Sequence, residues 1–226
     1  MSAKLPAAYL ARIVHDAHVV AAKAKASDLI NSRVRIGWSH TLGLYAEASC
    51  FTVAVRSSWH PDDMGDETQW RGGHEPWTVD VDRATAKQLV SCFKTSGRHM
   101  QAPVTVHDPE GLTLRMTSET TDGNPYVTYM ADCLEPVTFD LEVDSIMDAA
   151  GDPVDRPKVL VPGTVSEILG KTSAGGVHAA WYPVRTGDYL QRYAMIARTG
   201  LREPKESDMA PVGDRFVLVT SPRIAI

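Results

Sequence analysis

Basic side chains recur along residues 82–99 at the spacing of one side of a helix. This basic side is formed by Arg83, Lys87, Lys94 and Arg98. The opposite side is apolar, with Ala86, Leu89 and Phe93 among its residues. Lys and Arg side chains on a solvated surface neutralise phosphates. The chemistry that this segment suits is therefore the binding of a polyanion such as DNA.

Two further segments repeat the arrangement. In residues 5–25 an apolar stripe that includes Leu10 and Ile13 lies opposite Arg12, His15 and Lys23. In residues 185–202 a third helix is predicted after Thr186 as N-cap. Its basic residues are Arg185, Arg192, Arg198 and Arg202.

The charge of these three segments differs from that of the rest of the chain. Residues 3–26, 82–99 and 185–202 each carry four Lys or Arg against one Asp, which gives +9 in total. The whole chain carries −5, so the remainder carries −14. Charge on one exposed helix side usually reflects only solvation. Three basic helices in an acidic protein predict a lining that attracts polyanions while the remaining surface repels them.

A nucleotide-binding loop is the main enzymatic alternative. Residues 163–172 end in Gly170-Lys171-Thr172 after an apolar segment, as a phosphate-binding loop does. However, Val165 stands where a glycine is needed, and Glu167 would repel a phosphate. The segment is better explained as an amphipathic helix that ends near Gly170.

The histidines are weak candidates for metal or acid–base chemistry. His60, Asp62, Asp63 and His74 lie in a Gly-, Asp- and Pro-rich segment that reads as an exposed loop. No pair of histidines has the i, i+4 helical spacing or the Cys partner of a zinc site, and no G-x-S-x-G motif is present. We therefore expect no metal, no cofactor and no catalytic activity.

Composition places the chain among globular cytoplasmic proteins. Its 226 residues, 43% of them apolar, suffice for one large domain or two of ordinary size. No apolar run approaches the roughly 20 residues that cross a bilayer, and we expect no membrane association. Cys50, Cys92 and Cys133 are odd in number and far apart, which favours reduced thiols.

The order of predicted elements indicates an α+β fold. Alternation and turn residues predict mainly antiparallel strands and a hairpin around residues 108–111. The strands are expected near 34–36, 43–45, 51–55, 77–79, 104–106, 112–114, 126–130, 158–161 and 216–220, and a short helix at 164–172. Each half then supplies two helices packed on antiparallel strands, and we expect domains at 1–134 and 135–226.

These residues resemble the DNA sliding-clamp family, the processivity factors of replicative polymerases. The resemblance is carried by 44–58, by Glu75-Pro76-Trp77-Thr78-Val79-Asp80 leading into 84–93, and by 104–115. The C-terminal run from Arg215 to Pro222 also resembles the closing strand of bacterial clamps. The match covers about half of the chain as a pattern of elements, and its departures are those of a divergent clamp such as a phage encodes.

The resemblance implies a ring of six domains with basic helices on the inside. Two domains per chain then imply a homotrimer with head-to-tail contacts between edge strands. It also implies sequence-independent binding of duplex DNA, and a DNA polymerase and a clamp loader as partners. By position, Val219, Ser221 and Pro222 would line a pocket for partner peptides, although Ser221 replaces a common methionine. A clamp-like protein that forms no ring and binds host replication proteins remains the alternative.

Overall fold

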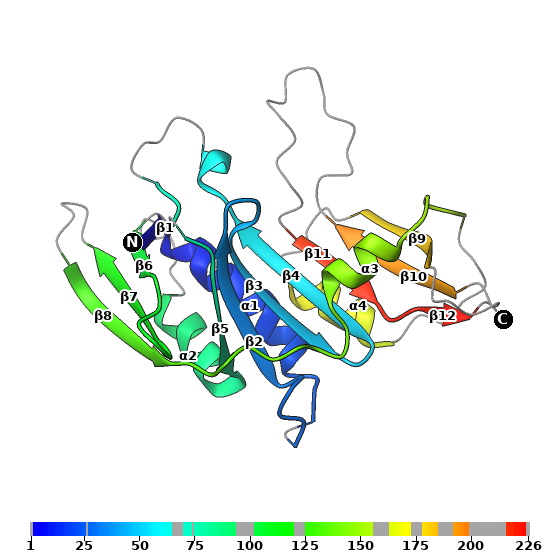
Figure 1. Ribbon diagram of the computed structural model, residues 1–226, viewed down its shortest axis with the longest axis horizontal. Helices are drawn as coiled ribbons and strands as arrows, with labels where there is room; N and C mark the ends of the chain where they lie inside the picture. The colour runs from blue at the N-terminus through cyan, green and yellow to red at the C-terminus, as the bar shows by residue number, and fades with distance from the viewer. Residues whose placement is uncertain are drawn as a thin grey trace.

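The computed structural model describes residues 2–25, 27–64, 70–73, 75–93, 102–119, 125–155, 163–172, 178–184, 192–198 and 216–224 (Figure 1). The helices are α1 (Ala7–Ala21), α2 (Arg83–Phe93), α3 (Val143–Ala149) and α4 (Gly163–Lys171), with a 3-10 turn η1 (Pro61–Met64). The strands are β1 (Ser2–Pro6), β2 (Arg33–Ser39), β3 (Gly43–Cys50), β4 (Val53–Trp59), β5 (Trp77–Asp82), β6 (Pro103–His107), β7 (Thr113–Glu119), β8 (Pro125–Asp132), β9 (His178–Val184), β10 (Arg192–Arg198), β11 (Phe216–Thr220) and β12 (Arg223–Ile224).

A strand, a helix and three antiparallel strands occur twice in succession. The first repeat is β1, α1 and β2 to β4, and the second is β5, α2 and β6 to β8. Each repeat lends its first strand to the other, because β1 pairs with β6 and β5 pairs with β2. The exchange joins the two repeats into one domain-like body. The sequence predicted similarity between the two halves of the chain, whereas this repeat lies within residues 2–132.

A further unit of one helix and three strands, formed by α4 and β9 to β11, extends the same sheet. Strands β9, β10 and β11 follow α4 and lie in sequence order, as β2 to β4 follow α1. Strand β11 pairs antiparallel with β4, from Phe216 opposite Ser57 to Thr220 opposite Val53. This junction produces one sheet of eight strands, beside the four-stranded sheet of β1, β6, β7 and β8.

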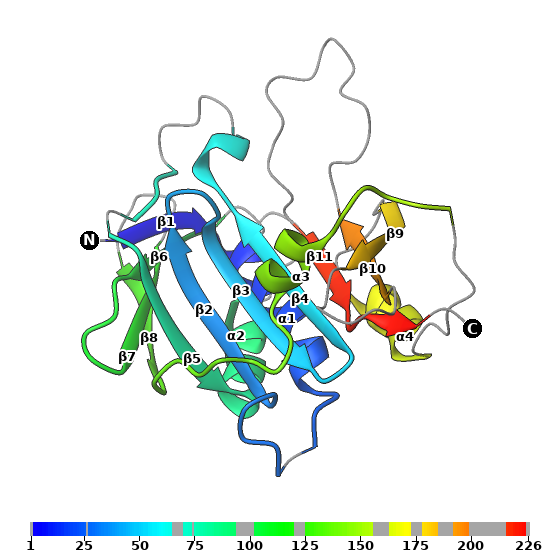
Figure 2. The same cartoon turned by 45° about the vertical axis from the view of Figure 1, so that its right-hand side comes forward.

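The two faces of the large sheet are covered by different helices (Figures 1 and 2). Helices α1, α2 and α4 pack in one core cluster with alternate strand residues, among them Val55 and Leu218. We call this side the helix face. Helix α3 packs in a second cluster with the intervening residues, among them Ala54 and Val219. We call that side the outer face. Successive residues of each strand thus point to opposite cores.

Local chemistry explains where α1 and α2 begin. Pro6 fixes its own φ and favours extended backbone at the preceding residue, so Leu5 belongs to strand β1 and the helix starts at Ala7. The predicted start at residue 5 was therefore wrong. Asp82 ends β5, and its carboxylate accepts a 2.7 Å hydrogen bond from the backbone N–H of Thr85. This is an N-cap at the first turn of α2.

Most predicted elements are confirmed, and the third basic helix is wrong. Residues 192–198 form strand β10, and residues 185–191 and 199–202 lie outside the described part of the chain. Strand β10 contributes to both cores, with Met195 on the helix face and Ile196 on the outer face. A strand buried on both faces is apolar at successive positions, so its spacing also fits a helix. The short helix α4 formed as predicted, and the predicted strand at 158–161 lies outside the described residues. Elements α3, β1, β9 and β12 were not predicted.

We expect Leu89→Ala to destabilise the fold and Lys87→Ala to leave it nearly unchanged. Leu89 is buried in the core beneath α2, whereas Lys87 is exposed on the same helix. Loss of the buried side chain costs about 2–5 kcal/mol, and the surface change costs within about 0.5 kcal/mol. Urea unfolding of both variants measures this. Equal losses would contradict the assignment of the two sides of α2.

Candidate functional site

The exposed sides of α1 and α2 bring basic residues together on the helix face. Helix α1 packs beside α2 and also contacts α4. Most of α1 is therefore buried, and its partly exposed stripe includes Arg12 and His15. Lys87 is exposed on α2, and Arg83 is partly exposed at its start. The predicted basic residues of the first two segments that the structure describes thus lie on one side of the molecule.

Electrostatic coupling shows that the basic groups of α1 and α2 are close. Burial lowers the pKa of His18 below its ordinary 6.5, and the neighbouring charges of His15, Lys87 and Arg83 lower it further. His18 was not among the predicted site residues, although it lies one helical turn after His15. The seam between α1 and α2 is therefore a region of positive potential, which favours an approaching anion.

A carboxylate of α4 borders this basic seam. Glu167 accepts contacts from Lys23 at 2.5 Å and from Lys171 at 2.6 Å. The two ammonium groups lower the pKa of Glu167 to about 2. The His15 ring nitrogen Nε2 also lies 2.9 Å from the Lys171 backbone oxygen. Lys23 is thus partly neutralised by Glu167, and α4 is tied to α1.

The remaining predicted DNA-contacting residues either lie outside the described residues or face away from this surface. Lys94, Arg98, Arg185 and Arg202 lie outside the described residues. Arg192 and Arg198 share the alternation of Ala194 and Ile196, which face the outer core beneath α3. The sheet therefore separates these two arginines from the stripe of α1 and α2, because β10 is a strand and not the predicted helix.

The predicted pocket for a partner peptide falls beside the β4·β11 junction. Val219 is fully buried and packs in the outer core with residues of α3. Ser221 and Pro222 are partly exposed, and the Ser221 backbone N–H donates a 2.9 Å hydrogen bond to the Thr52 oxygen. These contacts fix the chain after β11. A peptide site at these residues remains a proposal.

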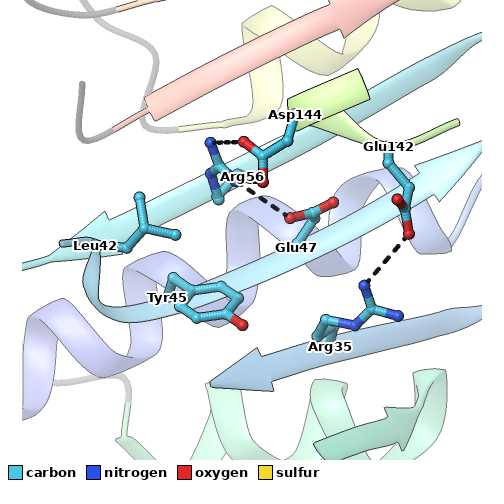
Figure 3. Close-up of a pocket in the computed structure, with 7 residues that line it drawn as sticks. All are labelled: Arg35, Leu42, Tyr45, Glu47, Arg56, Glu142 and Asp144. Atoms are coloured by element: carbon cyan, nitrogen blue, oxygen red, sulfur yellow. Dashed lines mark hydrogen bonds and ion pairs between the residues drawn. The ribbon is translucent and has the colours of Figure 1, made fainter. Parts of the chain in front are cut away.

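A polar pocket of about 120 Å³ lies on the outer face, where sequence reasoning placed no site. Figure 3 shows Arg56 between Glu47 and Asp144, with Arg35 directed toward Glu142. The distances are 2.7 Å for Arg56 to Asp144, 3.8 Å for Arg56 to Glu47 and 3.7 Å for Arg35 to Glu142. Both guanidinium groups are thus already paired with carboxylates, so the pocket mainly anchors α3 to the sheet.

The segment before α3 is held by Arg35, one of the two arginines of this pocket. Arg35 contacts the fully buried Asp80 at 3.4 Å and donates to the Val137 backbone oxygen. Its guanidinium also lies 4.5 Å from the centre of the Phe139 ring. Asp80 in turn accepts a 3.0 Å hydrogen bond from the Val137 backbone N–H. The connection between the two halves is therefore fixed on the outer face by buried charge.

Neither of the enzymatic alternatives gains support from the geometry. Residues 163–171 form a regular helix, so Gly170-Lys171-Thr172 stands at a helix C-terminus. A phosphate-binding loop instead precedes a helix N-terminus, and the nucleotide-binding hypothesis is wrong. Within the described ranges no three His, Cys, Asp or Glu side chains are grouped as metal ligands, and His74 lies outside those ranges. No helix in the described part of the chain is long and apolar enough to cross a membrane.

Solved structures share this arrangement over nearly the whole chain. A DNA polymerase sliding clamp from Pseudomonas aeruginosa aligns with a TM-score of 0.53 and 10% identity, over 97% of this chain and 64% of that one. The DNA polymerase III beta chain from Streptococcus pneumoniae gives 0.51 and 10%, over 98% and 64%. The chain has a sliding-clamp fold. No family profile matches the sequence, and no curated protein matches it.

The arrangement of helices and strands described above is that of a sliding-clamp fold. The match confirms the α+β class and the clamp-like architecture expected from the sequence. The beta subunit of the Streptococcus pyogenes DNA polymerase is also similar, with a TM-score of 0.50 and 8% identity, over 100% of this chain and 65% of that one. The chain thus spans about two thirds of the length of these clamps.

We expect the stability of the protein to depend on pH through Glu47. Burial raises the pKa of Glu47 above its ordinary 4.5, although Arg56 and Arg35 oppose this effect. Above pH 4.5 the native state then binds more protons at Glu47 than the unfolded state does. The contribution of Glu47 to stability therefore falls as the pH rises through its native pKa.

Glu47→Gln should remove this dependence. The unfolding free energy of the variant, relative to the wild type, should increase as the pH is raised from 4.5, as measured by urea unfolding at several pH values. Glu142→Gln, which changes a less buried carboxylate of the same pocket, serves as the control. Parallel curves for Glu47→Gln and the wild type would show that Glu47 does not titrate as described.

Proposed function

We propose that this protein is a DNA sliding clamp, a non-catalytic processivity factor that encircles duplex DNA and tethers a replicative polymerase. One observation carries the proposal. In a clamp-like fold, α1 and α2 lie side by side and present Arg12, His15, His18, Arg83 and Lys87 on the same side. The similar solved structures are those of DNA polymerase clamps, which supports this kind of function.

The chemistry of the helix face suits loose, sequence-independent contact. Lys and Arg contacts to phosphates carry no base information. They also weaken steeply with salt because counterions are released on binding. The negative charge of the remaining chain would keep DNA from other surfaces. Lys94, Arg98, Arg185 and Arg202 remain proposed contacts outside the described residues, and no such role is proposed for Arg192 or Arg198.

The partners proposed are duplex DNA, a polymerase and a clamp loader, in the cytoplasm. Domains at 1–134 and 135–226 fit the complete pair of repeats that ends at Asp132. A homotrimer would need two complete domains from each chain. The first two repeats span 58 and 56 residues, at 2–59 and 77–132, whereas only the 30 residues 133–162 separate β8 from α4. We therefore propose a ring without fixing the number of copies at three.

The same spacing supports a second candidate, a clamp-like protein that forms no ring. Thirty residues between β8 and α4 are too few for another complete repeat, and part of them forms α3 on the outer face. A protein of this kind would bind replication proteins without encircling DNA.

Charge reversal on the helix face should weaken DNA binding. We expect Lys87→Glu to lower affinity for duplex DNA and to reduce the slope of log affinity against log salt by about 1 to 2. Arg115→Glu is the matched control, because Arg115 is exposed on β7 between the buried residues Leu114 and Met116 and so points away from the helices that pack on the four-stranded sheet. Fluorescence anisotropy at several salt concentrations measures both. Equal effects of the two variants would reject the helix face as the DNA surface.

Retention on circular DNA separates the two candidate functions. A closed ring is linked topologically to a circle and slides off a linear end. Protein assembled on nicked circular duplex should survive gel filtration in high salt and be lost after a single linearising cut, with retention falling at least about tenfold. Equal retention on both DNA forms would reject encirclement and favour the non-ring protein.

A further inference from the structure

A single exposed carboxylate interrupts the basic surface formed by the helices of the helix face. Helices α1, α2 and α4 carry two acidic residues between them, Asp16 and Glu167. Asp16 is fully buried, whereas the side chain of Glu167 on α4 is 43% exposed. The other charged residues of the three helices are arginines and lysines. Glu167 is therefore the carboxylate of these helices that an approaching polyanion would meet.

The basic surface continues from α1 onto α4 at His15. The charge of His15 acts on His18 in the seam between α1 and α2. The same ring donates a 2.9 Å hydrogen bond from Nε2 to the Lys171 backbone oxygen, because a carbonyl oxygen only accepts. The end of α4 thus adjoins the seam, and the basic surface spans three helices.

Glu167 binds both lysines at this end of the surface. Its Oε1 atom lies 2.5 Å from Lys23 Nζ and 2.6 Å from Lys171 Nζ. Hydrogen bonds from Lys171 and Lys23 lower the pKa of Glu167 to about 2, so the carboxylate stays ionised wherever DNA binding is measured. A carboxylate and a phosphate are both oxygen anions that accept charge-assisted hydrogen bonds from ammonium groups. Glu167 therefore occupies the two lysines in the way that a DNA phosphate would.

The ion pairs of Glu167 are poorly suited to holding the fold together. The side chains of Glu167 and Lys171 are 43% and 56% exposed, and exposed ion pairs contribute little to stability. Helix α4 is anchored instead by Val165 and Ile168, which are buried in the core of the helix face. The main effect of Glu167 is therefore on the local electrostatic potential.

We propose that Glu167 competes with DNA phosphates for Lys23 and Lys171 and thereby keeps the contact with DNA weak. The inference rests on the proposed function, because it takes duplex DNA as the polyanion. Each lysine has a flexible four-carbon stem and can exchange one acceptor for another. A phosphate that approaches must displace the carboxylate, and the like charges of the two groups repel. Two contacts are weakened in this way, which suits a protein that slides along DNA.

Glu167→Gln tests the competition, because the amide keeps the shape of the side chain and removes its charge. Affinity for a fluorescein-labelled duplex should rise about fivefold or more at low salt, and the slope of log affinity against log salt should steepen by about 1 to 2. Fluorescence anisotropy at several salt concentrations measures both quantities. The urea midpoint of the variant should stay close to that of the wild type, since the lost ion pairs are exposed.

Glu142→Gln is the matched control, because it removes the same charge from a carboxylate that is paired with Arg35 on the outer face. The side chain of Glu142 is 34% exposed, which is close to the 43% of Glu167. This variant should change duplex affinity by less than about twofold, since salt screens distant charges. Adding Lys23→Gln and Lys171→Gln to Glu167→Gln should remove the gain, because the released ammonium groups produce it.

Three results would overturn the inference. These are an unchanged or lower affinity of Glu167→Gln, an equal gain in Glu142→Gln, and a gain that persists without the two lysines. The Lys87→Glu variant separates such a failure from failure of the proposed function. If Lys87→Glu weakens DNA binding and Glu167→Gln does not strengthen it, the DNA surface stands and the competition is rejected. If neither variant alters DNA binding, the proposed DNA surface is rejected as well.

Discussion

The pairing of β4 with β11 is the contact on which the arrangement of the second half depends. Five residue pairs join the two strands, and the Ser221 N–H extends the pairing to Thr52. The junction brings α4, the helix that precedes β9, to the face where Glu167 and Lys171 contact residues of the α1 segment. With it, α1 and α4 meet on one face, and α3 covers the opposite face. A single strand pairing therefore determines which surface each helix occupies.

Two kinds of interaction secure that arrangement from opposite sides. On the helix face, Glu167 links α4 to Lys23, which follows the end of α1. On the outer face, Arg56 and Arg35 are paired with carboxylates that include Glu47 and Asp144. Exposed ion pairs contribute little, whereas buried charges are costly when one partner is lost. The outer network is thus the stronger constraint on how α3 and its connection are oriented.

The same geometry separates the charged surfaces of the molecule. Basic groups of α1 and α2 lie close together: the pKa of His18 is lowered by burial and further by the neighbouring charges of His15, Lys87 and Arg83. On the outer face, Arg35 and Arg56 are instead paired with carboxylates and contribute little net field. The proposed DNA contact rests on this difference in charge between the two faces.

The sequence by itself determined the amphipathic helix at 83–93, most strands of the first 132 residues and the basic character of Arg12, Arg83 and Lys87. These features follow from local periodicity, which packing preserved. Only the tertiary structure decided that 192–198 is a strand, because a segment buried on both faces loses the alternation that identifies strands. It also decided which charges meet. His18 approaches Lys87, and Glu47 approaches Asp144, through contacts between elements that lie far apart in the chain.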